Sequence, residues 1–423
     1  MGEKIKKFRY LIFLKDTLLL ALSAFGGPQA HISHMFKLMV DKRRYVTEEE
    51  LIELNALCQI LPGPTSTQTI TAIGYKKGGP KLAFLTLLVW ILPAGAAMVF
   101  LSIYLTILEG NGVSLGFTKF IQPMALVFIF YSGVKLSQKV VKTKIAYLLF
   151  ICSTLLSVLI TYRLGHMQIA SVLFPVLLVI GGVVTSVLNY REHKRERNKR
   201  TLQIDWKFFI WFVAIFFVAV TLGNVFSNRF VLLFENFYRN GSLIFGGGQV
   251  LIPLLKTEFV SLKGYLTNEE FLSGFGFVQG MPGPVFSFTG YIGGLSVHDQ
   301  GVMAQVLAGA ISLLGVFLPG TLLIFFVIKF WEELKQYRFV RASLEGISAV
   351  ASGMVISAVI TLLFLINLTD FSVTTSIDVN VFEIPGLINI GVMVGTFLLL
   401  KWDKIPAPFI ILAGLVAGII FPL

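Results

Sequence analysis

The sequence predicts an all-α polytopic membrane protein built from two repeats of inverted topology. Hydrophobic residues make up 55% of the chain and charged residues 14%, with a mean hydropathy of +0.80. Such a chain is far more apolar than soluble proteins are. Residues 25–74 and 245–294 also align without a gap at a constant offset of 220 residues. The positions of the basic loops, finally, indicate that the two copies face opposite ways.

Several apolar segments are long enough to cross a membrane, which takes at least about 18 apolar residues for about 30 Å of hydrocarbon. These segments are 80–108, 118–134, 145–163, 168–190, 206–223, 302–328, 342–366, 384–400 and 405–422. We therefore predict about nine full spans, in addition to the repeated segments, which are treated separately below.

Positively charged loops mark the cytoplasmic side of membrane proteins. Basic residues gather in the connecting loops 76–81, 135–144, 191–207, 329–341 and 401–404. The loop 366–383 carries acidic residues and no base, and therefore belongs outside. This alternation predicts a multi-pass protein of the cytoplasmic membrane with its N-terminus inside and its C-terminus outside. We interpret the basic run 191–200 as a turn between two membrane helices, and expect no nucleic-acid partner.

The same alternation gives the two copies opposite orientations. After the first copy the chain reaches the cytoplasm near Lys76, whereas after the second it must be outside, because one more crossing places Lys329 inside. The span 206–223 has no counterpart before residue 10 and reverses the second copy. We divide the chain into a first repeat at 1–190, a basic cytoplasmic loop with the orientation-reversing helix at 191–227, and a second repeat at 228–423. Inverted repeats are typical of secondary transporters, whose substrate site lies near the midplane between the repeats.

Each copy contains a helix that must break. Thr47 and Glu50 form a capping box that starts a helix, and the run from Pro62 to Pro64 stops it by removing amide donors. A second short helix over 65–75 then begins at the break, and its N-terminal amides would attract an anion.

A second break in each copy involves glycine pairs. Gly26 and Gly27 form it in the first copy, and Gly246 and Gly247 in the second. Irregular backbone at membrane depth is tolerated only where protein buries it or where it lines a wet cavity, so we expect the four breaks to converge. The broken segments either re-enter as hairpins or cross as interrupted helices, which would raise the count to about thirteen spans.

The breaks supply most of the candidate substrate-binding residues. They carry polar side chains or expose backbone, and are Gly26, Gly27, Gln29, His31, Gln59, Pro62, Gly63, Pro64, Thr65, Ser66, Thr67, Gln68, Gly246, Gly247, Gln249, Gln279, Pro282, Gly283, Pro284, Ser287 and Thr289. The alternative role for these polar groups is helix capping, stapling of the broken backbone, or hydrogen bonding between helices. The first copy offers more donors, so we expect it to contribute more to an anion site.

The remaining ionisable residues leave two roles open. Glu49, Glu50, Glu269 and Glu270 are candidates for proton coupling, although capping explains one of each pair. A metal site is not expected, because the pair formed by His31 and His34 lacks further ligands. Common motifs of hydrolases, metalloproteases and nucleotide-binding enzymes are missing from the sequence, so we expect neither an enzyme nor a cofactor.

The repeated motifs closely resemble those of the chromate ion transporter family in its long, two-domain form. The runs FGGPQAHI and QILPGPTSTQ in the first half, and FGGGQVLIP, YLTNEEF and QGMPGPVFSF in the second, carry the resemblance, which covers nearly the whole chain. It implies export of chromate, driven by the membrane potential or a proton gradient, and chromate resistance. A carrier of sulfate or another oxyanion, and an anion channel, are the alternatives. The expected partners are the oxyanion and the lipid bilayer, with a homodimer left open.

Overall fold

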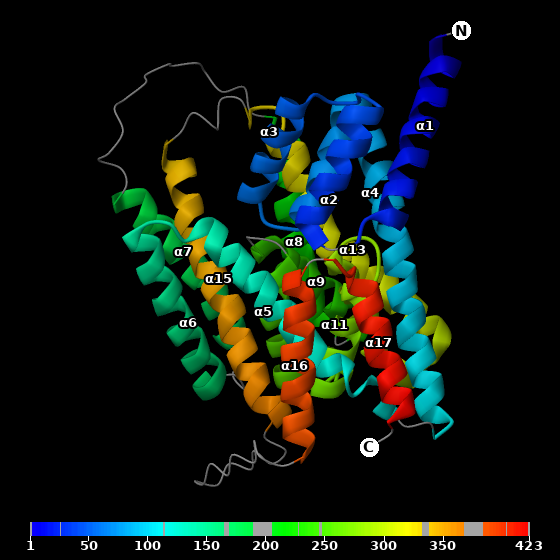
Figure 1. Cartoon of the computed structure of the whole chain (residues 1–423). Helices are drawn as coiled ribbons and strands as arrows, with labels where there is room; N and C mark the ends of the chain where they lie inside the picture. Colours follow the sequence, from blue (N-terminus) through cyan, green and yellow to red (C-terminus); the bar gives the residue numbers. More distant parts are fainter. Residues whose placement is uncertain are drawn as a thin grey trace.

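The computed structural model describes residues 2–25, 27–112, 115–164, 169–188, 205–226, 228–244, 248–331, 338–367, 384–402 and 404–421. Every regular element within these ranges is helical, and Figure 1 shows long helices around shorter ones. The predicted all-α class is therefore confirmed. Gly26, Gly246, Gly247 and the basic run 191–200 lie outside the described residues.

The first repeat begins with short helices and continues with long ones. Its elements are α1 (Gly2–Ser23), α2 (Gly27–Met35), the π-helix η1 (Phe36–Lys42), α3 (Glu48–Ile60), α4 (Thr65–Gly110), the 3-10 helix η2 (Leu115–Thr118), α5 (Ile121–Val140), α6 (Lys144–Leu164) and α7 (Ile169–Leu188). α4 joins the short helix expected after the Pro-Gly-Pro break to the first predicted full span. Its two parts meet at a kink where Gly78 and Gly79 are not helical, and the expected basic loop at this point is absorbed into α4.

The second half follows a similar order after one additional helix. Its elements are α8 (Lys207–Val225), α9 (Arg229–Leu243), α10 (Gly248–Leu255), the π-helix η4 (Lys256–Leu262), α11 (Asn268–Gln279), the 3-10 helix η5 (Val285–Ser287), α12 (Phe288–Leu295), the 3-10 helix η6 (His298–Gln300), α13 (Val302–Val327), α15 (Arg338–Asn367), α16 (Ile384–Trp402) and α17 (Ala407–Ile420). α8 occupies the segment that the sequence predicts to reverse the second repeat.

The sequence repeat recurs as a repeat of elements. The π-helices η1 and η4 begin 220 residues apart, at positions 36 and 256, and α3 and α11 do so at positions 48 and 268. The predicted capping boxes are also present, formed by Thr47 with Glu50 and by Thr267 with Glu270. The duplicated sequence thus folds in the same local way twice.

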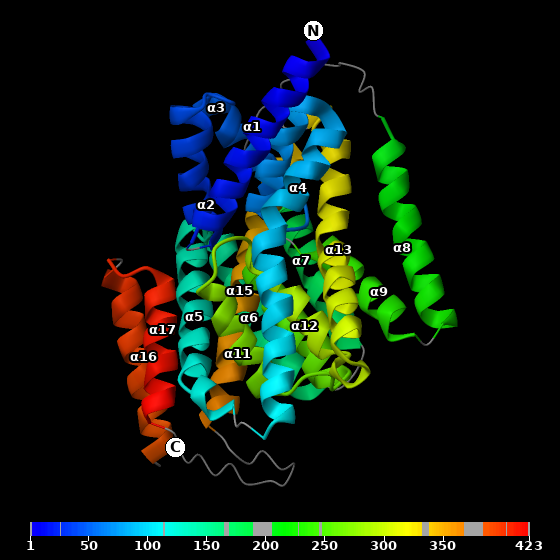
Figure 2. The ribbon, with the colours of Figure 1, turned by 90° about the vertical axis from the view of Figure 1, so that its right-hand side faces the viewer.

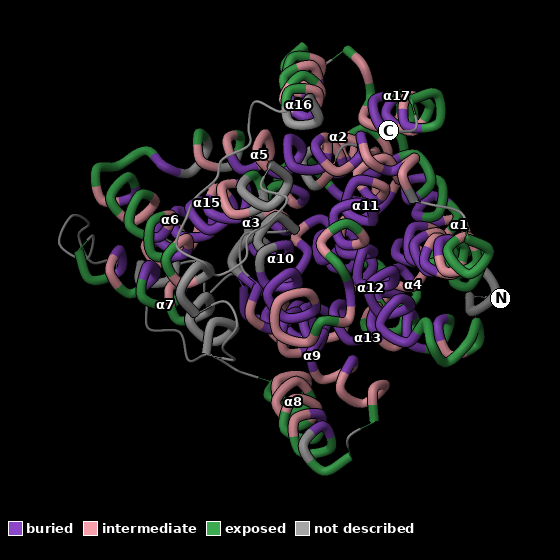
Figure 3. Tube along the Cα trace, turned by 90° about the horizontal axis from the view of Figure 1, so that it is seen from below, coloured by how far each residue is buried: buried purple, intermediate pink, exposed green. Residues whose placement is uncertain are grey.

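All nine predicted spans coincide with helices. By length and composition alone, three helical segments in the described part of the chain could cross a membrane, namely Thr65–Gly110, Gly116–Lys135 and Val302–Val327. The other predicted spans fall on shorter apolar helices. Exposed apolar side chains on these helices, such as Trp211 and Phe217 of α8, form the outer surface, while the buried residues concentrate towards the centre (Figure 3). An apolar outer surface suits a lipid environment.

The broken segments fold back as hairpins. Both side views place α1, α2 and α3 in the same half of the molecule, the upper half, while α9 and α11 lie below them (Figures 1 and 2). Figure 2 shows α12 in the lower half as well. The N-terminus lies at the top and the C-terminus at the bottom. The chain therefore turns back at its breaks, as in the re-entrant alternative. The inverted relation between the repeats remains a prediction.

A strained residue marks the tip of the first hairpin. Arg44 has a φ of 52°, a left-handed conformation that is costly for residues with a side chain, and Gly264 has a φ of 59° at the position 220 residues later. The turn thus requires the same backbone in both repeats, although only the second repeat uses the residue that adopts it without strain.

We expect the substitution Gly264→Ala to destabilise the protein by about 1 kcal/mol, and Arg44→Gly to have no destabilising effect or to raise the melting temperature. A Cβ on Gly264 would meet nothing within 4 Å, so the cost measures backbone strain alone. Thermal unfolding of the two purified variants would test this. A lower melting temperature for Arg44→Gly would show that the arginine side chain contributes more than its backbone costs.

Candidate functional site

The breaks of the two repeats meet through reciprocal backbone hydrogen bonds. The amide of Gly63 donates to the carbonyl of Ile244 at 2.7 Å, and the amide of Gly283 donates to the carbonyl of Ala24 at 2.9 Å. Both donors and both acceptors are related by the 220-residue offset, because Gly283 is the counterpart of Gly63 and Ile244 that of Ala24. Each Pro-Gly-Pro segment is therefore bonded to the end of the first helix of the other repeat.

A long helix of each repeat passes close to the Pro-Gly-Pro break of the other repeat. A Cβ on Gly63 would lie 3.4 Å from the Cα of Gly320 in α13, and a Cβ on Gly283 would lie 2.9 Å from the Cβ of Ala94 in α4. Gly320 and Ala94 each directly follow a proline inside their helix. The two glycines thus occupy narrow spaces between the repeats, and their φ values of 120° and 109° suit glycine alone.

The N-terminus of α4 opens at the first break with free donors. Pro64 is its N-cap residue and supplies no side-chain hydrogen bond, while the amide of Gln68 donates to the carbonyl of Pro64. The amides of Thr65, Ser66 and Thr67 have no partner among the described residues. Open amides at a helix N-terminus bind anions.

Gln68 staples the break that precedes it. Its Nε2 donates to the carbonyls of Pro62, at 2.8 Å, and Gly320, at 3.2 Å. Of the two polar atoms of the carboxamide, only the nitrogen can donate to carbonyl oxygens. The orientation of the side-chain amide is therefore fixed. Its Oε1 is consequently turned away from both carbonyls, and it is buried without a hydrogen-bond partner in the described part of the chain.

His31 of α2 packs against Ser66 and Trp90 of α4. Its Nδ1 lies 3.0 Å from the Oγ of Ser66, and its ring meets that of Trp90 edge-on at a centroid distance of 5.4 Å. Trp90 in turn donates from Nε1 to the Oγ1 of Thr67 at 3.1 Å. His31 is 1% exposed and its Nε2 has no partner among the described atoms. The predicted residues His31, Ser66 and Thr67 are thereby brought together.

The second repeat presents a different side-chain set at its break. Ser287 is fully buried and its Oγ has no partner within the described residues, whereas Thr289 donates to the carbonyl of Phe286. Phe288 stands where the first repeat has Gln68, and the 3-10 helix η5 precedes α12. Gln279 and Pro282 are half-buried here, while Pro284 is buried. The side chains of Gln29, Gln59 and Gln249 lie outside the described part.

The four candidate glutamates lie away from the breaks. Glu50 and Glu270 complete the capping boxes, and Glu49 and Glu269 are exposed beside them. The pKa of Glu50 is lowered, first by the hydrogen bond from Lys76 and then by that from the backbone of Thr47. A helix of 13 residues separates this end of α3 from the break, which is roughly 20 Å.

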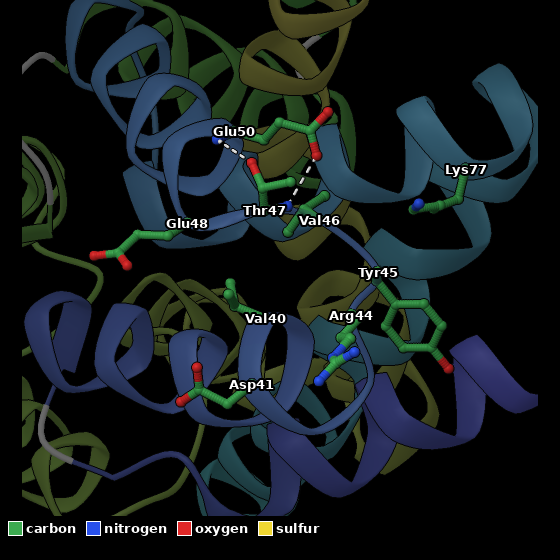
Figure 4. Close-up of a pocket in the computed structure, with 9 residues that line it drawn as sticks. All are labelled: Val40, Asp41, Arg44, Tyr45, Val46, Thr47, Glu48, Glu50 and Lys77. Carbon is green, nitrogen blue, oxygen red and sulfur yellow. Dashed lines mark hydrogen bonds between the residues drawn. The ribbon is translucent and has the colours of Figure 1, made fainter.

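A polar pocket of about 650 Å³ surrounds the start of α3. Figure 4 shows its lining, which consists of Val40, Asp41, Arg44, Tyr45, Val46, Thr47, Glu48, Glu50 and Lys77. Acidic and basic side chains both face it, and no residue of the breaks lines it. This pocket is therefore distinct from the expected anion site.

Charged residues tie the first helix of each repeat to its hairpin. In the first repeat Asp16, which is buried, accepts hydrogen bonds from Arg43 at 2.8 Å and from Tyr45 at 2.6 Å. In the second repeat Arg239 of α9 reaches Glu258 of η4 at 3.0 Å. The sequence interpretation missed these pairs because their partners are distant along the chain.

Trp90 and Gly320 were also missed as neighbours of the site. Trp90 lies inside a predicted span and seemed to be an ordinary apolar residue, although a buried indole N–H needs an acceptor. Gly320 follows Pro319, the residue that echoes Pro93 in the first half. The recurrence of this proline in both halves was the sequence signal that could have pointed to both positions.

We expect Gly63→Ala and Gly283→Ala each to lower stability by about 1–3 kcal/mol, because a side chain would be strained and would crowd the crossing. Gly79→Ala is the matched control, with a φ of 71° and nothing within 4 Å of an added Cβ. Thermal unfolding of the purified variants measures the difference. Equal losses in all three variants would mean that the crossing itself contributes nothing.

Comparison with known proteins supplies a family. A family model described as chromate transporter matches residues 11–187 and 231–419. A probable chromate transport protein of Synechococcus elongatus is 25% identical over 404 residues, covering 96% of this chain and 93% of the relative. Chromate transport proteins of Pseudomonas aeruginosa and Cupriavidus metallidurans are 25% and 22% identical over 423 and 432 residues, covering 97% and 96% of this chain and 91% and 92% of the relatives. No solved structure matches the chain.

Proposed function

The chain belongs to the chromate transporter family, and from this premise we propose that it is a secondary active carrier that exports chromate or a closely similar oxyanion across the cytoplasmic membrane. As a member of that family it is an integral membrane protein that transports ions, and not an enzyme. Export driven by the membrane potential or a proton gradient would confer resistance to chromate. The relatives in Pseudomonas aeruginosa and Cupriavidus metallidurans, which carry the name chromate transport protein, support chromate as the first substrate to test.

The reciprocal contact between the breaks is the observation that carries this proposal. It brings the open N-terminus of α4 to the interface of the two repeats, where Ser66, Thr67 and Gln68 are buried. A buried oxyanion must replace its hydration by several donors, which helix amides and hydroxyls supply without a fixed positive charge. The described residues of the breaks include no lysine or arginine, so the site would also permit release, as a carrier requires.

Alternating access would follow from movement of one repeat against the other around this crossing. The reciprocal hydrogen bonds and the hairpins on opposite halves of the molecule support inverted repeats (Figure 2). The contact between Lys329 and Asp205 puts two loops that carry positive charge in the sequence on the same face, as expected if both are cytoplasmic.

An anion channel could use the same helix end. Transport into everted membrane vesicles separates the two, because a carrier gives saturable uptake that collapses with the driving gradient. Currents that persist without a gradient of the coupling ion, and that do not saturate, would favour the channel. Competition by sulfate in the same assay tests the alternative substrate.

We expect Ser66→Ala to raise the KM for chromate about fivefold to tenfold in everted vesicles, because it removes a hydroxyl worth about 1 kcal/mol beside His31. Thr71→Val is the matched control, since its hydroxyl is already bonded to the carbonyl of Thr67 within the same helix. Protein level and melting temperature are measured alongside. An unchanged KM for Ser66→Ala, or an equal rise for Thr71→Val, would contradict the placement of the site.

A further inference from the structure

The unpartnered Oε1 of Gln68 requires an explanation. Gln68 is 2% exposed, and both carbonyls that its side chain reaches are bonded by Nε2. Leaving a buried acceptor without a donor costs about 1–3 kcal/mol. The contacts of Nε2 with Pro62 and Gly320 account for an amide at this position, but they leave the cost of the buried oxygen in place. A donor that faces Oε1 would remove that cost.

The oxygen lies at the same end of α4 as the open amides. Gln68 is the fourth residue of the helix, and its Nε2 reaches back to Pro62, which precedes the helix. A side chain that makes this contact must extend over the N-terminal end of α4. Its amide group therefore lies at the end of α4 where the N–H groups of Thr65, Ser66 and Thr67 are open, and its Oε1 adds one acceptor to this end of the helix.

This arrangement does not suit a fully ionised oxyanion. A dianion such as sulfate has only acceptor oxygens, so one of them would face Oε1 with no hydrogen between them. An oxyanion that retains one proton has acceptors for the amides and a single O–H donor for the glutamine.

We propose that this site binds the oxyanion in its singly protonated form, with the substrate O–H donating to Oε1 of Gln68 and the other oxygens accepting from the N-terminal amides of α4. The inference rests on the proposed function and deepens it. No covalent bond of the protein changes, and the proton travels with the anion.

The consequence is a chemical basis for specificity. Chromate retains a proton at near-neutral pH in a substantial fraction of the ions, whereas sulfate and selenate are fully ionised there. Shape and formal charge distinguish these tetrahedral anions poorly. A buried group that needs a substrate O–H rejects an analogue without it by several orders of magnitude. Gln68 would thus separate chromate from the abundant sulfate ion.

The effect of protein groups that titrate in the same pH range must be distinguished from the effect of the substrate proton. The described titratable side chains on the elements that pack against α4 are Lys6, Lys7, Arg9, Tyr10, Lys15 and Asp16 of α1, His31 and His34 of α2, Glu48, Glu49, Glu50, Glu53 and Cys58 of α3, Glu269 and Glu270 of α11, and Tyr291 of α12, with Tyr75, Lys76, Lys77, Lys81, Tyr104 and Glu109 on α4 itself. α13 carries no charged residue. Selenate controls for all of these groups, because any effect of protein titration acts on both anions.

The test is calorimetric titration of the purified full chain with potassium chromate and potassium selenate, from mildly acidic to mildly alkaline pH. We expect chromate affinity to fall about tenfold per pH unit once the substrate proton dissociates, and selenate to bind at least about a hundredfold more weakly without that slope. Equal affinities, or chromate binding that does not change with pH, would overturn the inference and leave the carrier proposal intact. Failure to bind either anion at any pH would overturn both.

Two variants complete the experiment. Gln68→Met removes the acceptor, and we expect it to bind chromate and selenate within about threefold of each other and without the pH slope. Gln305→Met is the matched control, because Gln305 is another buried glutamine that bonds Thr106 on a different part of the bundle. Retained discrimination in a folded Gln68→Met protein would overturn the role of Gln68. If that variant fails to fold, the titration of the unaltered protein still decides.

Discussion

The structure depends on two backbone hydrogen bonds that join the breaks of its repeats. A helix that ends at membrane depth leaves carbonyls and amides that no water can satisfy. The carbonyl of Ala24 finds the amide of Gly283, and the carbonyl of Ile244 finds the amide of Gly63. Neither repeat can make this exchange alone. A broken helix is thus tolerated in one repeat because the other repeat supplies the missing partner, which gives the duplication a physical purpose.

The same constraint explains why open hydrogen-bond donors are present where the breaks meet. Glycine is required at both crossings because of its backbone and because of the close approach of α13 and α4. The amide of each of these glycines is already bonded to a carbonyl of the other repeat. The donors that remain open are the N-terminal amides of the helix that follows each break. In the first repeat these open directly at Pro64, and Gln68 holds the loop in place. In the second repeat Phe288 takes that position, so the pseudo-symmetric backbone carries an asymmetric chemistry.

The sequence was sufficient for the features that depend on local chemistry. Capping boxes, proline breaks and apolar spans are set by residues within a few positions of one another, and each is found where it was predicted. The kink at Gly78 and Gly79 was hidden by lysines that indicated a loop. The contacts of Gln68 with Gly320 and of Trp90 with Thr67 could not be foreseen, because they join residues 252 and 23 positions apart. Burial of Asp16 likewise depends on Arg43, on a different element.

The ionic ties between helix and hairpin indicate which part of the repeat is free to change. In the first repeat the acid lies on α1 and the base follows η1, whereas in the second Glu258 of η4 binds Arg239 of α9 and also Lys263, which corresponds to Arg43. Asn236 stands at the position of Asp16. The second repeat thus has no acid at the first position and carries one, Glu258, on the opposite partner. The fold requires an ion pair or charged hydrogen bond between helix and hairpin, but not a particular placement of the acid. With the hairpins held in this way, the side chains at the breaks are free to differ between the two repeats.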